Sequence, residues 1–111
     1  MSIPSAVELL RHMQEAVQQT LDYVEGWTKD DFLADKRTQQ AVILNLIILG
    51  EAATKLMDHY PDVAAAHPDI EWRSMRGMRN RIAHGYYDID LDVVWETVIS
   101  ALPRLSLLLQ T

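Results

Sequence analysis

The amino-acid sequence predicts an all-α fold, an antiparallel bundle of four to five helices. Apolar residues recur at steps of three and four positions along most of the 111-residue chain, the spacing of helices that bury one face. Only four glycines and four prolines interrupt this pattern, and no stretch shows the alternation of a convincing strand. A chain of this length is expected to form a single domain, residues 1–111, with a substantial core.

The first helix is expected over residues 5–25. Ser5 can cap its N-terminus, with Glu8 three residues later as in a capping box, and Gly26 is placed to end it. The residues expected to form its core stripe are Val7, Leu9, Leu10, Met13, Ala16, Val17, Leu21 and Val24.

Two helices are expected next in the chain. A short one spans residues 29–34, with Thr28 as its cap and acidic residues in its first turn. A long one spans about 36–59 and stops before Pro61, which cannot continue a helix. Its segment "AVILNLIILG" is apolar almost all round, so we expect part of this helix to face the bundle and part to face a second copy of the chain. The following "PDVAAAHPDI" is expected to be a loop or a helical turn.

A fourth helix is expected over about 71–84, ending at Gly85 in the C′ position. The residues on its expected core face are Met75, Met78 and Ile82. The segment "DIDLD" then caps a last helix, in which Pro103 predicts a kink. The core stripe expected in that helix consists of Val94, Val98, Ile99, Leu102, Leu105 and Leu109.

Composition limits the classes of function. The absence of cysteine excludes disulfides, a thiol nucleophile and thiolate metal sites, and it fits a cytoplasmic protein. The longest apolar run is about half the length of a membrane span, and the N-terminal segment lacks the layout of a signal peptide, so no membrane partner is expected.

The charge distribution is uneven. A formal net charge of −6 argues against a nucleic-acid partner when the chain is taken as a whole. Four of the ten basic residues nevertheless fall within nine positions: Arg73, Arg76, Arg79 and Arg81. The sequence therefore permits a local basic site on an acidic body.

Polar side chains of this basic segment are expected on one arc of the fourth helix. At about 100° per residue, Arg73, Arg76, Asn80 and His84 lie next to one another, and Asn80 stacks on His84 four residues later. Arg79 lies beside the core face, from which its long side chain can reach the same pocket. No acidic residue of this helix falls on the arc, so it suits a phosphate or a carboxylate. Histidine can move a proton there, while arginine stabilises charge on phosphate oxygens.

The tyrosines after the helix allow two interpretations. Tyr86, beyond Gly85, can bring its hydroxyl near the same pocket as His84. Alternatively, Tyr86 and Tyr87 form an aromatic pair that covers the end of the bundle, and this second interpretation is preferred for Tyr87.

Glu51 is the only acid in the apolar part of the long helix, and its role is also open. It can pair on the surface with Lys55, four residues on. It can instead be a buried partner that holds Arg79 or Arg76 in position.

The string "RNRIAH", Arg79-Asn80-x-x-x-His84, resembles the signature of HEPN-domain ribonucleases. Its extension to Tyr86 resembles the HepT toxins, which are encoded beside a minimal nucleotidyltransferase antitoxin, MntA. The resemblance covers nearly the whole chain, including "NLIILGEAA", "WRSMRGMRNRIAHGYYDID", "VWETV" and "LPRL". The short motif alone is a weak signal, whereas the full string in a helical setting is a strong one.

The resemblance implies an all-α bundle that dimerises, with two copies of the motif forming a composite ribonuclease site. It implies RNA cleavage without a metal or cofactor, by attack of the RNA 2′-hydroxyl on the adjacent phosphate. Arg79 would stabilise the scissile phosphate, and His84 would be the general acid or base. Asn80 would orient the phosphate or the histidine. Tyr86 matches the tyrosine that the antitoxin modifies with AMP, which silences the toxin.

Three hypotheses follow. The leading one is a ribonuclease toxin of a toxin–antitoxin pair, in which Arg73 and Arg76 also contact RNA. The second is a non-catalytic nucleotide- or partner-binding subunit that docks the nucleotidyltransferase. The third, a plain structural dimer, leaves the polar arc unexplained.

Overall fold

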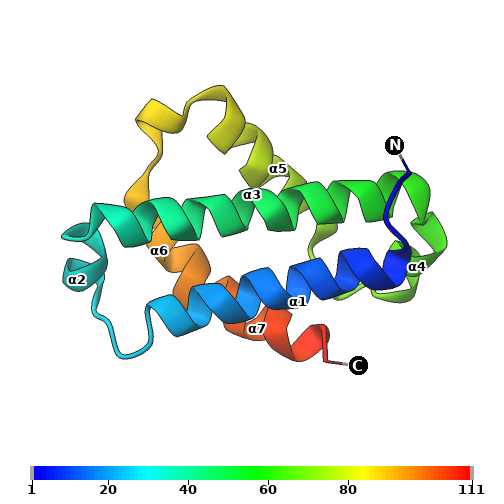
Figure 1. Ribbon diagram of the computed structural model, residues 1–111, viewed down its shortest axis with the longest axis horizontal. Coiled ribbons are helices and arrows are strands. Elements are labelled where there is room, and N and C mark those ends of the chain that lie inside the picture. The colour runs from blue at the N-terminus through cyan, green and yellow to red at the C-terminus, as the bar shows by residue number, and fades with distance from the viewer. Residues whose placement is uncertain (1, 111) are drawn as a thin grey trace.

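The computed structural model describes residues 2–110, and every regular element in that range is helical, as the sequence predicts (Figure 1). The elements in chain order are α1 (Ala6–Tyr23), α2 (Lys29–Leu33), α3 (Lys36–His59), α4 (Pro61–Ala66), α5 (Trp72–His84), the 3₁₀ turn η1 (Tyr86–Asp88), α6 (Leu91–Glu96), the π-helical segment η2 (Thr97–Ala101) and α7 (Leu102–Leu108). The expectation of four to five helices is therefore too low. The segment that begins at Pro61 forms a helix of its own, and a π segment divides the last helix in two.

The predicted caps of the first two helices are present. The Ser5 hydroxyl accepts a hydrogen bond from the Glu8 N–H at 3.1 Å. Thr28 and Asp31 form a reciprocal capping box at the start of α2. Between these helices the chain turns at Gly26, whose φ of +75° lies in the left-handed region that favours glycine. The glycine expected to end the first helix thus supplies the turn that follows it.

Helix α3 is the centre of the fold. It packs against α1 on one side and α5 on the other, and α1 and α3 run in opposite directions (Figure 1). Its buried residues are Val42, Asn45, Leu46, Leu49, Gly50, Ala52, Ala53 and Leu56. Full burial of a leucine or valine side chain contributes about 1.5–3 kcal/mol, so this helix supplies much of the core.

Helix α3 also keeps an apolar surface exposed. Leu44 is 57% exposed and Ile48 is 36% exposed. By length and composition, α3 could cross a membrane, a test that the core helix of a soluble protein also passes. Packing against α1 and α5 buries the core residues of α3, whereas Leu44 and Ile48 are not covered by any other part of the single chain that the structure describes.

Helix α5 approaches α3 very closely at Gly50. A Cβ atom at this position would lie 2.8 Å from the carbonyl oxygen of Met75, and closer still to Cβ of Arg79. No other residue fits there unless the helices move apart. Gly50 therefore sets the distance between the two helices and holds Arg79 against α3.

Pro103 predicts a kink in the last helix, and the structure has a widened π turn there instead. The Leu102 N–H donates to the Thr97 carbonyl, five residues back, within the π segment η2. The wider turn gives room where the proline ring would otherwise meet the carbonyl of Ile99. Val98 and Leu102 remain buried, whereas Ile99 is 47% exposed, so its assignment to the core is wrong.

The assignment of Val7 to the core of the first helix is also wrong. Val7 is 72% exposed, because the buried face of α1 is set by Leu9, Met13 and Val17. Residues two apart on a helix point in different directions, so Val7 cannot share the face of Leu9. The remaining predicted core residues of α1 and α5 are buried or half-buried.

Substitution Gly50→Ala should destabilise the protein. The extra methyl group overpacks the crossing at a cost of about 1–3 kcal/mol, which outweighs the gain of about 1 kcal/mol from removing a glycine inside a helix. Gly77→Ala is the matched control, because a Cβ there meets only Nη1 of Arg81, at 3.7 Å. Thermal unfolding should show a lower Tm for Gly50→Ala and a higher one for Gly77→Ala. An equal gain in both variants would contradict the close approach.

Candidate functional site

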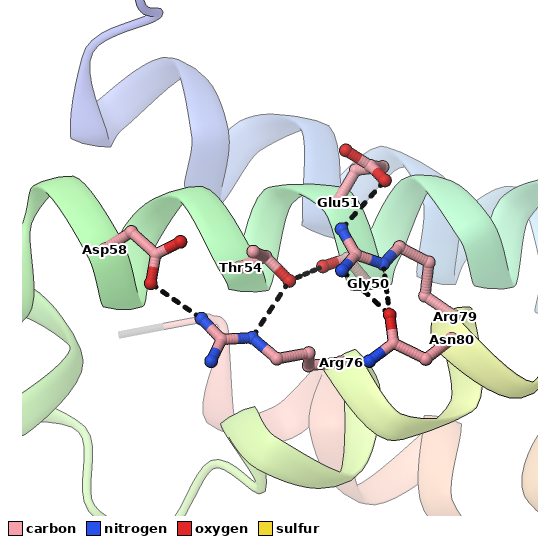
Figure 2. A network of polar contacts seen from close by, with 7 residues as sticks. All are labelled: Gly50, Glu51, Thr54, Asp58, Arg76, Arg79 and Asn80. Atoms are coloured by element: carbon pink, nitrogen blue, oxygen red, sulfur yellow. Dashed lines mark hydrogen bonds and ion pairs between the residues drawn. The ribbon is translucent and has the colours of Figure 1, made fainter.

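Three hydrogen bonds hold the guanidinium of Arg79 (Figure 2). Its Nη1 donates to Oε1 of Glu51 on α3 at 2.9 Å. Its Nε and Nη2 both donate to Oδ1 of Asn80, at 3.1 and 2.9 Å. The Arg79 side chain is only 20% exposed, so its orientation is fixed before any ligand arrives.

The chemistry of arginine determines how Asn80 is oriented. Arginine has only donors, five N–H groups in a planar fork, so the atom of Asn80 that faces it must be the oxygen. The Asn80 amide nitrogen then points away from Arg79 and remains available as a donor. Two N–H groups of Arg79 are also left for an anion. Arg79 and Asn80 together present donors that suit a phosphate oxygen.

Of the two interpretations of Glu51, the structure supports the one in which it holds Arg79. No ion pair joins Glu51 to Lys55 within residues 2–110. The carboxylate is not buried as expected, since the Glu51 side chain is 50% exposed. A pair this exposed contributes only about 0.2–1 kcal/mol to stability, so its main effect is to orient Arg79.

Arg76 is tied to α3 in a second set of contacts (Figure 2). Its Nη2 donates to Oδ1 of Asp58 at 2.8 Å, and its Nε lies 3.4 Å from the hydroxyl oxygen of Thr54. The Thr54 hydroxyl in turn donates to the carbonyl of Gly50 at 2.7 Å. Three N–H groups of Arg76 are left for an anion, and the Asp58 carboxylate reduces the net positive charge that the anion meets.

The polar arc is thus not free of acids in the folded protein. The expectation holds for α5 itself, but α3 brings Glu51 to Arg79 and Asp58 to Arg76. Sequence reasoning missed Asp58 and Thr54, which lie on α3 some twenty residues before the arginine that they contact. The sequence feature that could have indicated these contacts is Gly50, because a glycine inside an apolar helix indicates that another backbone lies close to it.

His84 is the last residue of α5, and its side chain is exposed. Within residues 2–110 it makes no hydrogen bond or ion pair, so both ring nitrogens are open to a substrate or a second chain. The helix ends as predicted, but Gly85 has an extended φ of −156° rather than a left-handed conformation. The monomer therefore places Arg79 and His84 on one helix without joining their side chains.

The remaining two arginines differ in position. Arg73 is exposed and lies on the same arc as His84. Arg81 lies across α5 from Arg79, where it makes a weak contact of 3.9 Å to the sulfur of Met78. It stands three residues before His84, so it is a neighbour of His84 on the helix surface but not of Arg79.

Tyr86 and Tyr87 stack on each other, with ring centroids 4.2 Å apart. They do not cover the end of the bundle, since Tyr86 is 60% exposed and Tyr87 is 86% exposed. Hydrogen bonding with Tyr87 raises the pKa of the Tyr86 hydroxyl above its ordinary value. The preferred interpretation of Tyr87 as a core cover is therefore wrong.

Within residues 2–110 no group of three or more His, Asp or Glu side chains is placed to hold an ion. The donors that the site does present are guanidinium, amide and imidazole groups.

Known proteins resemble this chain closely. Residues 13–111 match a family model described as Ribonuclease HepT-like. A relative from Thermococcus cleftensis, named "Probable ribonuclease HepT", is 38% identical over 96 residues, which cover 83% of this chain and 84% of that relative. A relative from Methanocaldococcus jannaschii, named as a "Putative RNase", is 34% identical over 90 residues, covering 81% of this chain and 72% of that relative. No solved structure matches the chain significantly. Because the family model covers nearly the whole sequence, the chain belongs to the HepT-like ribonuclease family.

Proposed function

We propose that this protein is the ribonuclease toxin of a toxin–antitoxin pair and cuts cellular RNA in the cytoplasm without a metal ion. The observation that carries the proposal is the fixed guanidinium of Arg79, held by Glu51 and Asn80 on the helix that ends at the exposed His84. Family membership supports the reaction class, and the donor geometry supports a phosphate as the bound group.

In the proposed reaction, the RNA 2′-oxygen forms a bond to the adjacent phosphorus and the bond from phosphorus to the 5′-oxygen breaks. One base must take the 2′-hydroxyl proton, and one acid must give a proton to the leaving 5′-oxygen. The products are a 2′,3′-cyclic phosphate and a 5′-hydroxyl. Arg79 stabilises the charge that develops on the phosphate oxygens, and the Asn80 amide supplies a further donor.

A dimer would supply both proton-transfer groups as two copies of His84. The exposed face of α3 supports such a dimer, because Leu44 and Ile48 lie within two turns of Glu51 on one side of the helix. Two copies that pack along this face bring their Arg79–Glu51 pairs close to the symmetry axis. The composite site is then assembled by the same contact that hides the apolar surface.

Regulation is proposed to act through Tyr86. Its ring is exposed two residues after His84, so a partner nucleotidyltransferase of the MntA type can reach its hydroxyl. Each AMP unit adds a negatively charged phosphate beside Arg79 and His84, which occupies the anion site and repels RNA.

A second candidate function is a non-catalytic subunit that binds the nucleotidyltransferase or its nucleotide. The ion pairs of Arg79 and Arg76 favour it, because they reduce the positive potential that RNA would meet. The exposed and unpaired His84 favours catalysis.

The direct test is RNA cleavage by the purified chain. Arg79→Ala should lose about 10²–10³-fold in rate, as for removal of a charge-stabilising donor, and His84→Ala about 10²–10⁴-fold, as for loss of a general acid or base. Arg11→Ala, at an exposed arginine of α1, is the control and should cut as the wild type does. End-group analysis should find 2′,3′-cyclic phosphates. A wild type that neither cuts RNA nor arrests growth without its partner excludes the toxin function.

AMP transfer should go to Tyr86. Mass spectrometry after co-expression with the cognate nucleotidyltransferase should place AMP on the wild type and on Tyr87→Phe, but not on Tyr86→Phe. Both variants keep the aromatic ring, so the difference reports only the acceptor hydroxyl. AMP found on Tyr87, or on no tyrosine, would rule out this regulation.

The dimer should depend on the exposed face of α3. Light scattering at micromolar concentration should show a dimer for the wild type and a monomer for Ile48→Glu, which buries two like charges at the interface. Val7→Glu changes an equally apolar, exposed residue on α1 and should remain dimeric. If the wild type is monomeric, the composite site is lost.

A further inference from the structure

The ring of Tyr87 is the most exposed aromatic surface among the described residues. It is 86% exposed, although a tyrosine normally buries most of its ring in a core or an interface. Its stacking on Tyr86 leaves one face of the ring uncovered, since little of its area is lost to that contact. The fold gains almost nothing from this side chain, so its ring is available to a ligand.

The pair is held in a defined position. Tyr86 and Tyr87 lie in the 3₁₀ turn η1, which the Asp88 N–H closes by donating to the Gly85 carbonyl at 2.9 Å. The two rings are inclined by 30°. In Figure 1 the turn after α5 projects away from α1 and the rest of the bundle. The ring of Tyr87, with the exposure given above, is therefore open to solvent on its outer face.

The turn begins two residues after His84, so the exposed ring is carried three residues beyond the proposed proton-transfer group. Single-stranded RNA is recognised largely by stacking of its unpaired bases on exposed aromatic rings. An RNA strand that runs from Arg79 along α5 past His84 would arrive at Tyr87, the third residue beyond the helix.

We propose that the outer face of Tyr87, supported from behind by Tyr86, is a stacking subsite for an unpaired RNA base adjacent to the scissile phosphate. This inference rests on the proposed ribonuclease function.

The surroundings of the ring favour a base over the RNA backbone or a protein. Its exposed neighbours Asp88 and Asp90 carry negative charge, which repels phosphate groups. The backbone therefore has to run on the side of α5 that carries Arg79 and Arg73. A protein hot spot is normally surrounded by other contact residues that exclude water, whereas the acids beside Tyr87 remain hydrated.

The test uses single-stranded, fully 2′-O-methylated oligonucleotides, which cannot be cut, each with one 2-aminopurine at a different position. Stacking on tyrosine quenches this base, so the wild type should quench it at one position near the cleavage site. Tyr87→Leu should remove the quenching and weaken binding by about 5- to 100-fold, as expected for loss of one base–aromatic stack. Tyr87→Phe should keep both, because the ring remains.

Tyr23→Leu is the matched control, since Tyr23 is an exposed tyrosine on α1, 42% exposed, outside the site. The cleavage rate of Tyr87→Leu at low RNA concentration should fall by the same factor as its affinity, while the rate at saturating RNA changes less. Circular dichroism should be unchanged in all three variants, because both positions are exposed.

The possible failures are distinguishable. If Tyr87→Leu binds, quenches and cuts like the wild type, the subsite does not exist and the ribonuclease function stands. If the wild type cuts no RNA, both are overturned. If Tyr87→Leu leaves RNA binding intact but abolishes association with the nucleotidyltransferase, the ring is a protein-docking surface and the base subsite is refuted.

Discussion

The candidate site depends on one steric constraint, the contact of α5 with α3 at Gly50. Because this position has no side chain, the backbone of α5 lies against α3 and Cβ of Arg79 rests where another residue's Cβ would be. From there the Arg79 guanidinium reaches Glu51, one residue after the glycine, and Arg76 reaches Thr54 and Asp58 on the next turns. The same crossing therefore sets the packing of the core and the positions of two arginines.

The network at this crossing holds the two arginines with different firmness. Arg79 is mostly buried and bonded through three of its five N–H groups, so it keeps a fixed orientation and still has donors for an anion. Arg76 is more exposed and is bonded through two N–H groups, to Asp58 and Thr54. Each arginine has a carboxylate partner, and each keeps donors for an anion. Arg79 has the more firmly fixed orientation, because it is less exposed and has one more hydrogen bond.

The fold followed closely from the sequence because helical periodicity and capping are local. The predicted bounds of α3 agree with the observed helix, and those of the other main helices agree within a few residues. The errors occurred where tertiary packing chose between nearby faces, as at Val7 and Ile99. Pro103 predicts an irregularity in the last helix, but the proline alone does not determine whether the helix kinks or forms a widened π turn. Periodicity indicates that a helix has an apolar face, whereas packing decides which residues at its edge are covered.

For the candidate site, the sequence by itself determined the residue types, their order on one helix and the family to which they belong. It placed Arg79, Asn80 and His84 within two helical turns, because helix geometry follows from spacing alone. Only the tertiary structure decided that Glu51 and Asp58 meet the arginines, that His84 is left unpaired, and that Tyr87 faces solvent. These contacts join segments about twenty or more residues apart, and their geometry depends on how closely two helices can approach, which no local pattern encodes.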